Sequence, residues 1–338
     1  MQSPSLGIRV KRSQGERVRR ALVELGLLDR SRRILSDGSN VYLPVLEMDE
    51  SQASRLSAIA GFDEVRLDFP ERVHHPGPEE LLGRRPRFEV VGEIAIVEDD
   101  DAEPVAQALL STMKGIRTVV APVSDVEGEF RTRRFRHIAG EERTETIHKE
   151  HGLRYRLDLE RTYFTARMGT ERLRVAEQVS PGDLVLDMFA GVGPFSLLAA
   201  KRGARVVAIE KNPAAIRYLR ENALLNRLQI EILEGDAAEL TSRYEGMADH
   251  VIMNLPHSAS QFLGQALRAA ASGGIIHYYA IAPEEDLFRD ESLVQREAGR
   301  IGAKVEVVYE GIVRSYAPHR YNVVMDLRMI RTGGQQQD

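Results

Sequence analysis

The sequence predicts an α/β protein whose second half is a doubly wound parallel sheet, and two observations support this. An apolar run, Leu184–Asp187, is followed by the turn Gly191-Val192-Gly193 and by a helical segment from Phe195, which is the order strand, tight turn, helix. Strand-like and helical segments then alternate over residues 180–329, as in a sheet built from crossover units. Ligands of such sheets bind beyond the carboxyl ends of the strands. This half of the chain is therefore expected to carry the site.

Two smaller folded parts are expected before this sheet. Residues 1–68 show strand patterns at 6–10 and 40–46 around a helix at 15–26, which predicts a small α+β module. Residues 69–87 contain four prolines and are interpreted as a linker. Residues 88–170 combine short strands, one of them at 129–135, with one helix and predict a second α+β domain. The sheet domain is then assigned to 171–332 and a polar tail to 333–338.

Composition excludes several classes of protein. None of the 338 residues is cysteine, so disulfides and thiolate metal sites are excluded. The sequence has no apolar run of 18 residues and no N-terminal signal pattern, so a soluble cytoplasmic protein is expected. His74 and His75 lie in the proposed linker without a third ligand nearby, and no metal site is predicted.

Basic residues are clustered although the formal net charge is −5. Residues 7–34 contain nine lysines and arginines against three acids, and a second cluster consists of Arg131, Arg133, Arg134 and Arg136. Phosphate contacts dominate affinity for nucleic acids. Two basic patches on an acidic chain therefore predict a folded RNA that is held at two points. The alternative is that both clusters are ordinary solvated faces.

The glycine turn and the strand ends indicate which cofactor binds. A dinucleotide fingerprint requires a third glycine where this chain has Ser196, which disfavours NAD. Glu210, after the second strand, is placed to accept both ribose hydroxyls of an adenosine, and Asp236, after the third, to meet the adenine edge. Asn254 follows the fourth strand and opens an Asn-Leu-Pro loop. This series resembles the class I methyltransferases that use S-adenosylmethionine.

The residues expected to hold that cofactor lie in the turn, at the strand ends and just before the sheet. They are Arg167, Asp187, Met188, Phe189, Gly191, Gly193, Glu210, Asp236, Asn254 and Pro256. Taken singly, the three carboxylates are also well placed as helix caps. Taken together, their convergence on one cleft favours cofactor binding.

Several motifs together resemble one family over essentially the whole chain. They are Tyr-Phe-x-x-Arg-x-x-x-Glu-Arg from Tyr163, Asp-Met-Phe-Ala-Gly-Val-Gly-Pro-Phe from Asp187, Asn-Leu-Pro from Asn254, His-Tyr-Tyr from His277 and Ser-Tyr-Ala-Pro from Ser315. The set is similar to the archaeal and eukaryotic tRNA guanosine-37 N1-methyltransferases. The resemblance implies a Rossmann-like class I methyltransferase fold. It also implies a tRNA partner, contacted at the anticodon loop and, through the N-terminal module, at the outer corner.

The resemblance also implies roles for individual residues. It implies that Glu171 is the general base and that Arg131 holds the reacting guanine. Asn254, on a loop made rigid by Pro256, is expected to help position the base. Guanine N1 carries a proton at neutral pH, so its methylation needs a proton acceptor and stabilisation of charge at O6. The target base must leave its stack, and Tyr163 can support it by stacking. The expected substrate-binding residues are Tyr163, Arg131, Arg133, Arg134, Arg174, Tyr316 and Pro318.

Alternatives remain at the level of the sequence. Glu171 can simply complement a helix dipole, and Tyr163 can belong to the core. Methyltransferases that act on nitrogen often have an (Asn/Asp)-Pro-Pro-(aromatic) loop. This chain has Leu255 and His257 at two of these positions, which disfavours an exocyclic amine as the target.

One rival function is a wyosine-pathway aminocarboxypropyl transferase, and another is a non-catalytic RNA-binding protein. The oligomeric state is not determined, with a monomer slightly favoured.

Overall fold

The computed structural model of the protein describes residues 4–72, 76–124 and 128–331. Two of the sequence predictions lie outside the described residues. They concern His74 and His75 of the expected linker and the expected polar tail at 333–338. The chain divides into two compact units, Met1–Pro76 and Gly77–Asp338, and each is described by itself. No helix of the described ranges is long and apolar enough to span a bilayer.

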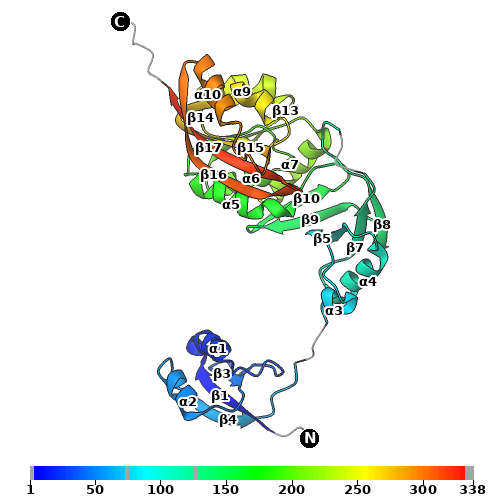
Figure 1. The fold of residues 1–338 in the computed structure, drawn as a ribbon, viewed down its shortest axis with the longest axis vertical. Coiled ribbons are helices and arrows are strands. Elements are labelled where there is room, and N and C mark those ends of the chain that lie inside the picture. The colour runs from blue at the N-terminus through cyan, green and yellow to red at the C-terminus, as the bar shows by residue number, and fades with distance from the viewer. Residues whose placement is uncertain (1–3, 73–75, 125–127, 332–338) are drawn as a thin grey trace. The chain divides into compact units, whose positions relative to one another are not determined.

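The first unit is a four-stranded sheet with two helices (Figure 1). Its strands lie in the order β2-β3-β1-β4, and its elements are β1 (Ser5–Lys11), the short helix η1 (Arg12–Gln14), α1 (Gly15–Glu24), β2 (Leu35–Ser36), β3 (Asn40–Pro44), α2 (Glu50–Ser57) and β4 (Asp63–Leu67). Ile8, Leu22 and Leu56 are fully buried between sheet and helices. The predicted strand–helix–strand core is confirmed, because alternating and helical apolar periodicity are strong local signals.

The stretch interpreted as a linker contains a helix, α3 (Pro78–Leu82). Pro78 occupies the first turn, where its missing N–H costs nothing. Two acids follow it in the first turn, and Gly83 ends the helix at φ +64°. Residues 78–82 of the expected linker are therefore helical, because a proline in the first turn does not interrupt a helix.

The next part of the second unit is a four-stranded sheet and a hairpin. The sheet has the order β5-β6-β7-β8, and the elements are β5 (Phe88–Val91), β6 (Ile94–Val97), α4 (Ala102–Thr112), β7 (Thr118–Pro122), β8 (Phe135–Gly140), and the hairpin β9 (Glu145–Glu150) and β10 (Leu153–Asp158). The strand expected at 129–135 is wrong: residues 128–131 form a turn, with Arg131 at φ +54°, and the strand begins at Phe135. Left-handed backbone at a non-glycine residue breaks strand geometry.

The large sheet has seven strands in the order β13-β12-β11-β14-β15-β17-β16. After the short helix η2 (Ala166–Met168) and α5 (Gly169–Gln178), its elements are β11 (Leu184–Asp187), α6 (Pro194–Lys201), β12 (Arg205–Glu210), α7 (Pro213–Leu225), β13 (Glu231–Glu234), α8 (Ala237–Leu240), η3 (Thr241–Tyr244), β14 (Ala248–Met253), η4 (Ala259–Phe262), α9 (Leu263–Ala269), β15 (Ala270–Pro283), α10 (Glu291–Arg300), β16 (Ala303–Ala317) and β17 (Arg320–Arg331). The first five strands of that order run parallel, and β17 is antiparallel to both neighbours. The predicted doubly wound α/β sheet is confirmed.

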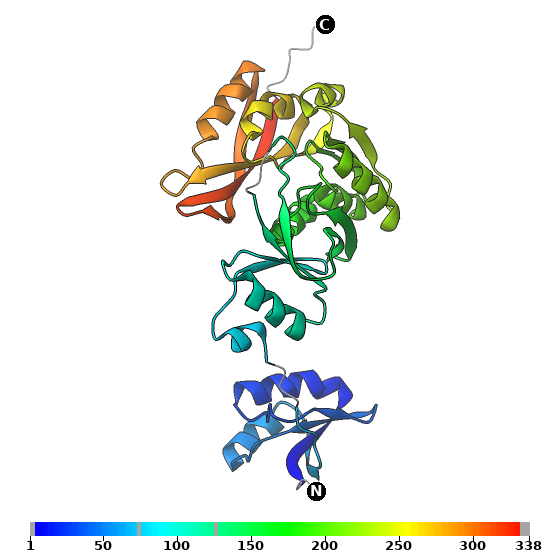
Figure 2. The ribbon, with the colours of Figure 1, turned by 90° about the vertical axis from the view of Figure 1, so that its right-hand side faces the viewer.

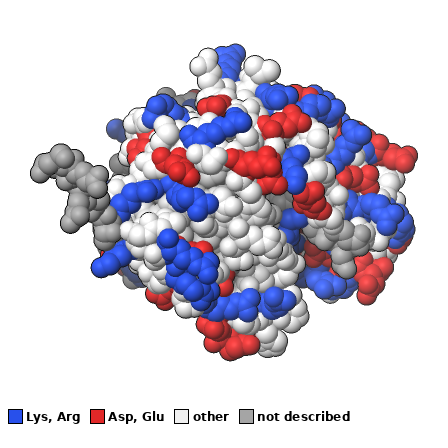
Figure 3. Space-filling view, turned by 90° about the horizontal axis from the view of Figure 1, so that it is seen from above, with Lys and Arg blue, Asp and Glu red and all other residues white. Residues whose placement is uncertain are grey.

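Helices cover both faces of this sheet (Figures 1 and 2). Leu186 of β11 packs into the apolar cluster that includes α9 and α10, whereas its neighbour Val185 packs into the cluster that includes α5 and α6. Strands that are buried on both faces are continuously apolar, which is why no alternation is visible in β11. Basic and acidic side chains are interspersed over the face shown in Figure 3.

Candidate active site

A cavity lies at the carboxyl ends of the parallel strands. Its walls come from the glycine turn after β11, the ends of β12 and β14, the start of α8, the segment before α5, the turn at Glu129–Arg131, and β16 with β17. Ten of the predicted site residues line it: Arg131, Tyr163, Met188, Phe189, Gly191, Glu210, Asp236, Asn254, Pro256 and Tyr316. The topology has therefore brought the strand-end set and the motif residues to one place.

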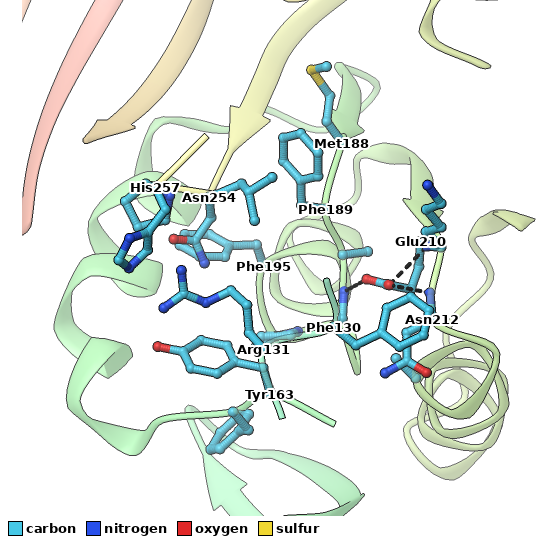
Figure 4. Close-up of a pocket in the computed structure, with 18 of the residues that line it drawn as sticks. Phe130, Arg131, Tyr163, Met188, Phe189, Phe195, Glu210, Asn212, Asn254 and His257 are labelled. Carbon is cyan, nitrogen blue, oxygen red and sulfur yellow. Dashed lines mark hydrogen bonds between the residues drawn. The ribbon is translucent and has the colours of Figure 1, made fainter. Parts of the chain in front are cut away.

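Glu210 ties two strand ends together at the floor of the cavity. Its Oε2 accepts the Gly191 N–H at 2.6 Å, while Oε1 accepts the N–H groups of Lys211 and Asn212 at 2.9 and 2.7 Å (Figure 4). Burial raises the pKa of Glu210, and the three backbone donors partly offset this rise. Each carboxylate oxygen has two lone pairs. Oε2 has one protein donor, so it can still accept a hydroxyl from a ligand.

The glycine turn has the conformation that its sequence demands. Gly191 and Gly193 have φ values of +57° and +91°, which glycine adopts without strain. A Cβ on Gly193 would clash with the side chain of Leu219. Gly193 is the N-cap of α6 and does not line the cavity, so its role is to let the helix pack closely.

Asp187 lies behind the turn and does not line the cavity. It is 1% exposed and accepts the Ser196 hydroxyl at 2.6 Å. Burial raises its pKa to about 6, against the opposing effect of the Ser196 hydrogen bond. The structure therefore places Asp187 as an anchor between β11 and α6, where it supports the turn.

A second carboxylate, Asp236, lines the cavity and caps α8. It accepts the Ala238 N–H at 2.8 Å and lies 3.1 Å from Lys211 Nζ. Lys211 is also 2.6 Å from Glu129, in the turn that carries Arg131. The cap hydrogen bond and the ammonium lower the pKa of Asp236. Lys211 thus joins the floor of the cavity to the Glu129–Arg131 turn.

Arg131 and Tyr163 form the opposite wall. The Arg131 guanidinium lies 5.2 Å from the centre of the Tyr163 ring, in cation–π geometry, and between that ring and the Asn254 side chain (Figure 4). His257 packs edge-on against Tyr316 at 5.2 Å. Burial, followed by the Arg131 charge, lowers the pKa of His257. This end of the cavity offers a flat aromatic face beside a fixed cation.

Glu171 is not among the residues that line the cavity, although Met168 and Arg172 of the same segment are. The Glu171 side chain is 9% exposed. Its Oε2 accepts Arg174 Nε at 2.9 Å, and its Oε1 accepts Arg174 Nη2 at 2.8 Å and the Tyr279 hydroxyl at 2.6 Å. The carboxylate is thus held beside the cavity by two partners, and Arg174, expected to bind substrate, is engaged within the protein.

The other predicted residues also lie outside the lining. Arg167 pairs with Glu89 at 3.0 Å and with Glu98 at 3.5 Å. Arg133 donates to the Ser124 carbonyl at 2.9 Å. Arg134 is exposed, and Pro318 lies in the turn between β16 and β17. These four residues therefore do not border the space that a ligand in the cavity would occupy.

Sequence reasoning missed polar residues from the two last strands. Arg314 and Asn322 both line the cavity, and Arg314 Nη2 lies 3.5 Å from the Tyr163 hydroxyl. Asn322 is 2% exposed, and its Oδ1 has no hydrogen-bond partner within the described residues. Two signals existed: Arg314 directly precedes the Ser-Tyr-Ala-Pro motif, and Asn322 is a polar residue in an apolar strand. A buried amide oxygen without a partner is costly, which suggests that a ligand satisfies it.

The basic cluster of the first unit forms a separate charged surface. Arg9, Arg19, Arg20 and Arg32 are neutralised by nearby acids. Five exposed cations of this cluster have no ion-pair partner among the described residues: Lys11, Arg12, Arg17, Arg30 and Arg33. These five cations are available to an anionic partner.

Family models match three parts of the chain. Residues 7–53 match the tRNA methyltransferase 5 N-terminal domain, residues 72–144 the TYW2 N-terminal domain, and residues 146–308 the TRM5/TYW2 methyltransferase domain.

Full-length relatives are similar along nearly the whole chain. The tRNA (guanine(37)-N(1))-methyltransferase Trm5b of Pyrococcus abyssi is 39% identical over 96% of this chain and 99% of its own, and that of Methanocaldococcus jannaschii is 34% identical over 96% and 98%. The crystal structure of Pyrococcus abyssi Trm5b superposes with a TM-score of 0.71 at 38% identity, covering 96% of this chain and 99% of that one. A complex of aTrm5 with tRNALeu gives a TM-score of 0.68 at 33% identity, covering 96% and 100%. The chain belongs to the TRM5/TYW2 methyltransferase family.

Proposed function

We propose that this protein transfers a methyl group from S-adenosylmethionine to N1 of guanosine-37 in tRNA. The observation that carries the proposal is one cavity in which the strand-end carboxylates Glu210 and Asp236 meet a guanidinium, Arg131, and an aromatic face, Tyr163. The two carboxylates suit an adenosine-containing methyl donor, whereas the guanidinium and the aromatic ring suit a purine that has left its stack.

The residues of the cavity fit the methyl donor. Glu210 Oε2 retains acceptor capacity for a ribose hydroxyl, the turn at Gly191 allows close backbone approach, and Asp236 borders the same space. When bound, S-adenosylmethionine supplies an electrophilic methyl group on a sulfonium. The protein's part is to orient this group and to prepare the nucleophile.

Guanine N1 has no available lone pair while it is protonated. We assign proton removal to Glu171 and stabilisation of the charge that develops at O6 to Arg131. The N1–H electron pair then forms the bond to the methyl carbon, the carbon–sulfur bond breaks, and its electrons stay on sulfur. Glu171 lies beside the cavity wall, so this assignment requires it to exchange one hydrogen bond, to Tyr279 or to Arg174, for one to guanine N1–H.

The tRNA contacts are assigned to two regions. Arg131, Tyr163 and Asn254 receive the base of nucleotide 37 in the anticodon loop. The five unpaired cations of the basic cluster at residues 7–34 bind backbone phosphates at the outer corner. The match of residues 7–53 to the tRNA methyltransferase 5 N-terminal domain supports the second assignment.

The rival chemistry is transfer of the aminocarboxypropyl group of the same donor. A relative named for that activity, from Pyrococcus horikoshii, is 32% identical over 75% of this chain, whereas the Trm5b relatives cover 96%. Similarity that extends over the first unit therefore favours methyl transfer.

Nucleoside mass analysis tests the proposal. A tRNA transcript with guanosine-37 is incubated with the protein and S-adenosylmethionine, digested and compared with a transcript that carries adenosine-37. The expected result is 1-methylguanosine from the first transcript only. A nucleoside heavier by an aminocarboxypropyl group would establish the rival activity, and unmodified RNA under conditions in which the protein binds tRNA would indicate a non-catalytic protein.

A further inference from the structure

Two polar side chains of the large sheet border the active-site cavity and carry buried atoms that no protein group satisfies. They are Arg314 of β16 and Asn322 of β17. Asn322 is 2% exposed, and its Oδ1 has no hydrogen-bond partner within the described ranges. Arg314 Nε is also buried without a partner there, while Nη2 lies 3.5 Å from the Tyr163 hydroxyl. Buried polar groups are normally hydrogen-bonded, so two such atoms at one wall of a cavity indicate a ligand.

Antiparallel pairing places these two side chains next to each other. Arg314 and Asn322 are register partners across β16 and β17, and the Cβ atoms of opposite residues in such a pair lie about 4.5–5.5 Å apart on one face. The guanidinium can only donate hydrogen bonds, and the amide oxygen can only accept them. Neither buried atom satisfies the other in this structure. The wall therefore presents an unpaired donor beside an unpaired acceptor.

The amide lies on the same face of the sheet as Glu171. Side chains alternate along a strand, so Asn322 and Val324 project on one face of β17. Val324 packs in the apolar cluster that includes α5, and its register partner is Tyr279, whose hydroxyl donates to Glu171 at 2.6 Å. The register partner of Asn322 is Ile281, two positions closer to the carboxyl end of β15. Asn322 is therefore the next residue on this face between the anchor of Glu171 and the strand ends that border the cavity.

The hydrogen-bonding groups of guanine follow one another along its edge in the order O6, N1–H, exocyclic amine and N3. The proposed function uses O6 for Arg131 and N1–H for Glu171, so the amine and N3 remain. The amine is a donor and N3 is an acceptor, and they are attached to the same ring carbon. An acceptor followed by a donor in the protein matches this pair, with the acceptor on the side of Glu171. Adenine and hypoxanthine have no amine at that carbon.

We propose that Asn322 and Arg314 are specificity-determining residues for the base of nucleotide 37. Asn322 Oδ1 accepts a hydrogen bond from the exocyclic amine of guanine, and the Arg314 guanidinium donates one to N3. The inference rests on the proposed function, which supplies the orientation of the base. A base that lacks either group leaves a buried polar atom of the protein unpaired, which is how a polar site rejects an analogue.

Two modified tRNAs separate the two contacts. Inosine-37 lacks the amine, and 3-deazaguanosine-37 lacks the N3 acceptor. The Kd of each is compared with that of guanosine-37 tRNA in the presence of S-adenosylhomocysteine, an unreactive analogue of the donor. The wild-type protein is expected to bind each modified tRNA about tenfold more weakly, the value of one hydrogen bond. Asn322→Ala should abolish the inosine penalty only, and Arg314→Ala the 3-deazaguanosine penalty only.

Arg328→Ala is the matched control. Arg328 also lies on β17, but it is outside the cavity lining and pairs with Glu306 at 3.0 Å. This variant should keep both penalties at the wild-type value. An Arg314→Ala or Asn322→Ala variant that binds all three tRNAs equally more weakly would overturn the proposal for that residue, because a contact with the sugar–phosphate backbone gives that result.

Asn322→Leu gives a second measurement that needs neither RNA nor activity. An apolar side chain of similar size replaces a buried amide that has no partner, so the urea midpoint of the free protein is expected to equal or exceed that of wild type. A lower midpoint would show that the free protein already satisfies the amide, and it would overturn the proposal. If wild type makes no 1-methylguanosine while the two penalties respond as expected, the proposed function fails and these two contacts stand. If it makes 1-methylguanosine while the penalties do not respond, only this inference fails.

Discussion

The carboxylate of Glu210 accepts the backbone N–H of Gly191 at 2.6 Å, which joins the end of β12 to the glycine turn after β11. The same carboxylate accepts two further N–H groups from the chain that follows it. Glu210 is therefore both a candidate ligand of ribose and a structural clamp on the turn. The two roles predict different consequences of its removal.

Glu210→Ala is expected to weaken binding of S-adenosylmethionine by about 1.5–3 kcal/mol, since a charge-assisted hydrogen bond is lost. Titration calorimetry measures this loss. Glu210→Gln keeps one acceptor oxygen and should lose less. Unchanged affinity in the alanine variant, with the fold intact by circular dichroism, would remove Glu210 from the cofactor site.

Glu171→Gln is expected to lower single-turnover methyl transfer by about 10²–10⁴-fold, the usual contribution of a general base. Rapid quench with tRNA in excess of its Kd measures the chemical step separately from product release. Glu177→Gln, at an exposed position of the same helix, is the control and should retain the wild-type rate.

A Glu171→Gln rate within about threefold of wild type would contradict the assignment of the base. Glu171 would then be a helix-start charge and an ion-pair partner of Arg174. The wild-type rate should also rise with pH through one apparent ionisation, because only the carboxylate accepts the N1 proton.

Deletion of residues 1–76, which form a compact unit of their own, is expected to raise KM for tRNA and to leave S-adenosylmethionine binding intact. The expectation follows from the five exposed cations of the basic cluster at residues 7–34 that have no ion-pair partner among the described residues. Steady-state kinetics with whole tRNA measures the effect.

An anticodon stem-loop lacks the outer corner and serves as the second substrate. The intact protein should bind it more weakly than whole tRNA, with a smaller dependence on salt, because fewer phosphates are neutralised. Arg17→Ala should weaken binding of whole tRNA. Arg20→Ala, at a cation already paired with Glu16, should matter less. Equal affinity for both RNAs would exclude this module from recognition.

The raised pKa of Asp187, about 6, predicts how stability depends on pH. Its unfolded value is about 3.9, so between about pH 4 and pH 6 the native state binds more protons than the unfolded state. The free energy of unfolding therefore falls as pH rises through this window, by about 3 kcal/mol for a shift of this size. Asp187→Asn keeps an acceptor for Ser196 and removes the buried charge.

Urea unfolding at pH 4.5 and pH 7.5 tests this point without cofactor. The free energy of unfolding of the Asp187→Asn variant should equal that of wild type within about 1 kcal/mol at the lower pH. At the higher pH it should exceed the wild-type value by about 1–3 kcal/mol. A difference that is the same at both pH values would show that the carboxyl does not titrate in this range.

Asn322 has a buried amide oxygen without a partner in the described structure, at the wall that is shared with Arg131 and Tyr163. Guanine offers an exocyclic amine next to N1, and inosine lacks it. Wild type is therefore expected to prefer guanosine-37 over inosine-37, and Asn322→Ala to reduce that preference by about tenfold, the value of one hydrogen bond. A preference that Asn322→Ala leaves unchanged would show that this amide does not contact the amine.

Local patterns in the sequence were sufficient for the architecture and for half of the site. The strand ends at Glu210, Asp236 and Asn254 were predicted because apolar runs, glycine turns and capping residues are encoded within a few positions. In parallel sheets such ends meet at one edge, so their convergence followed from the fold class alone.

Tertiary structure decided which side chains face the cavity. Glu171 contacts Tyr279, 108 residues away, and Arg174 contacts Asp326, 152 residues away. Arg314 and Asn322 reach the cavity only because β17 runs antiparallel beside β15. Hydrophobic periodicity places a residue on one face of a strand or helix. It does not show which residue of another strand or helix that side chain contacts. The sequence alone thus determined the fold and the strand-end residues that line the cavity, whereas long-range packing decided that Asp187 supports the turn and that Arg174 and Tyr279 hold Glu171.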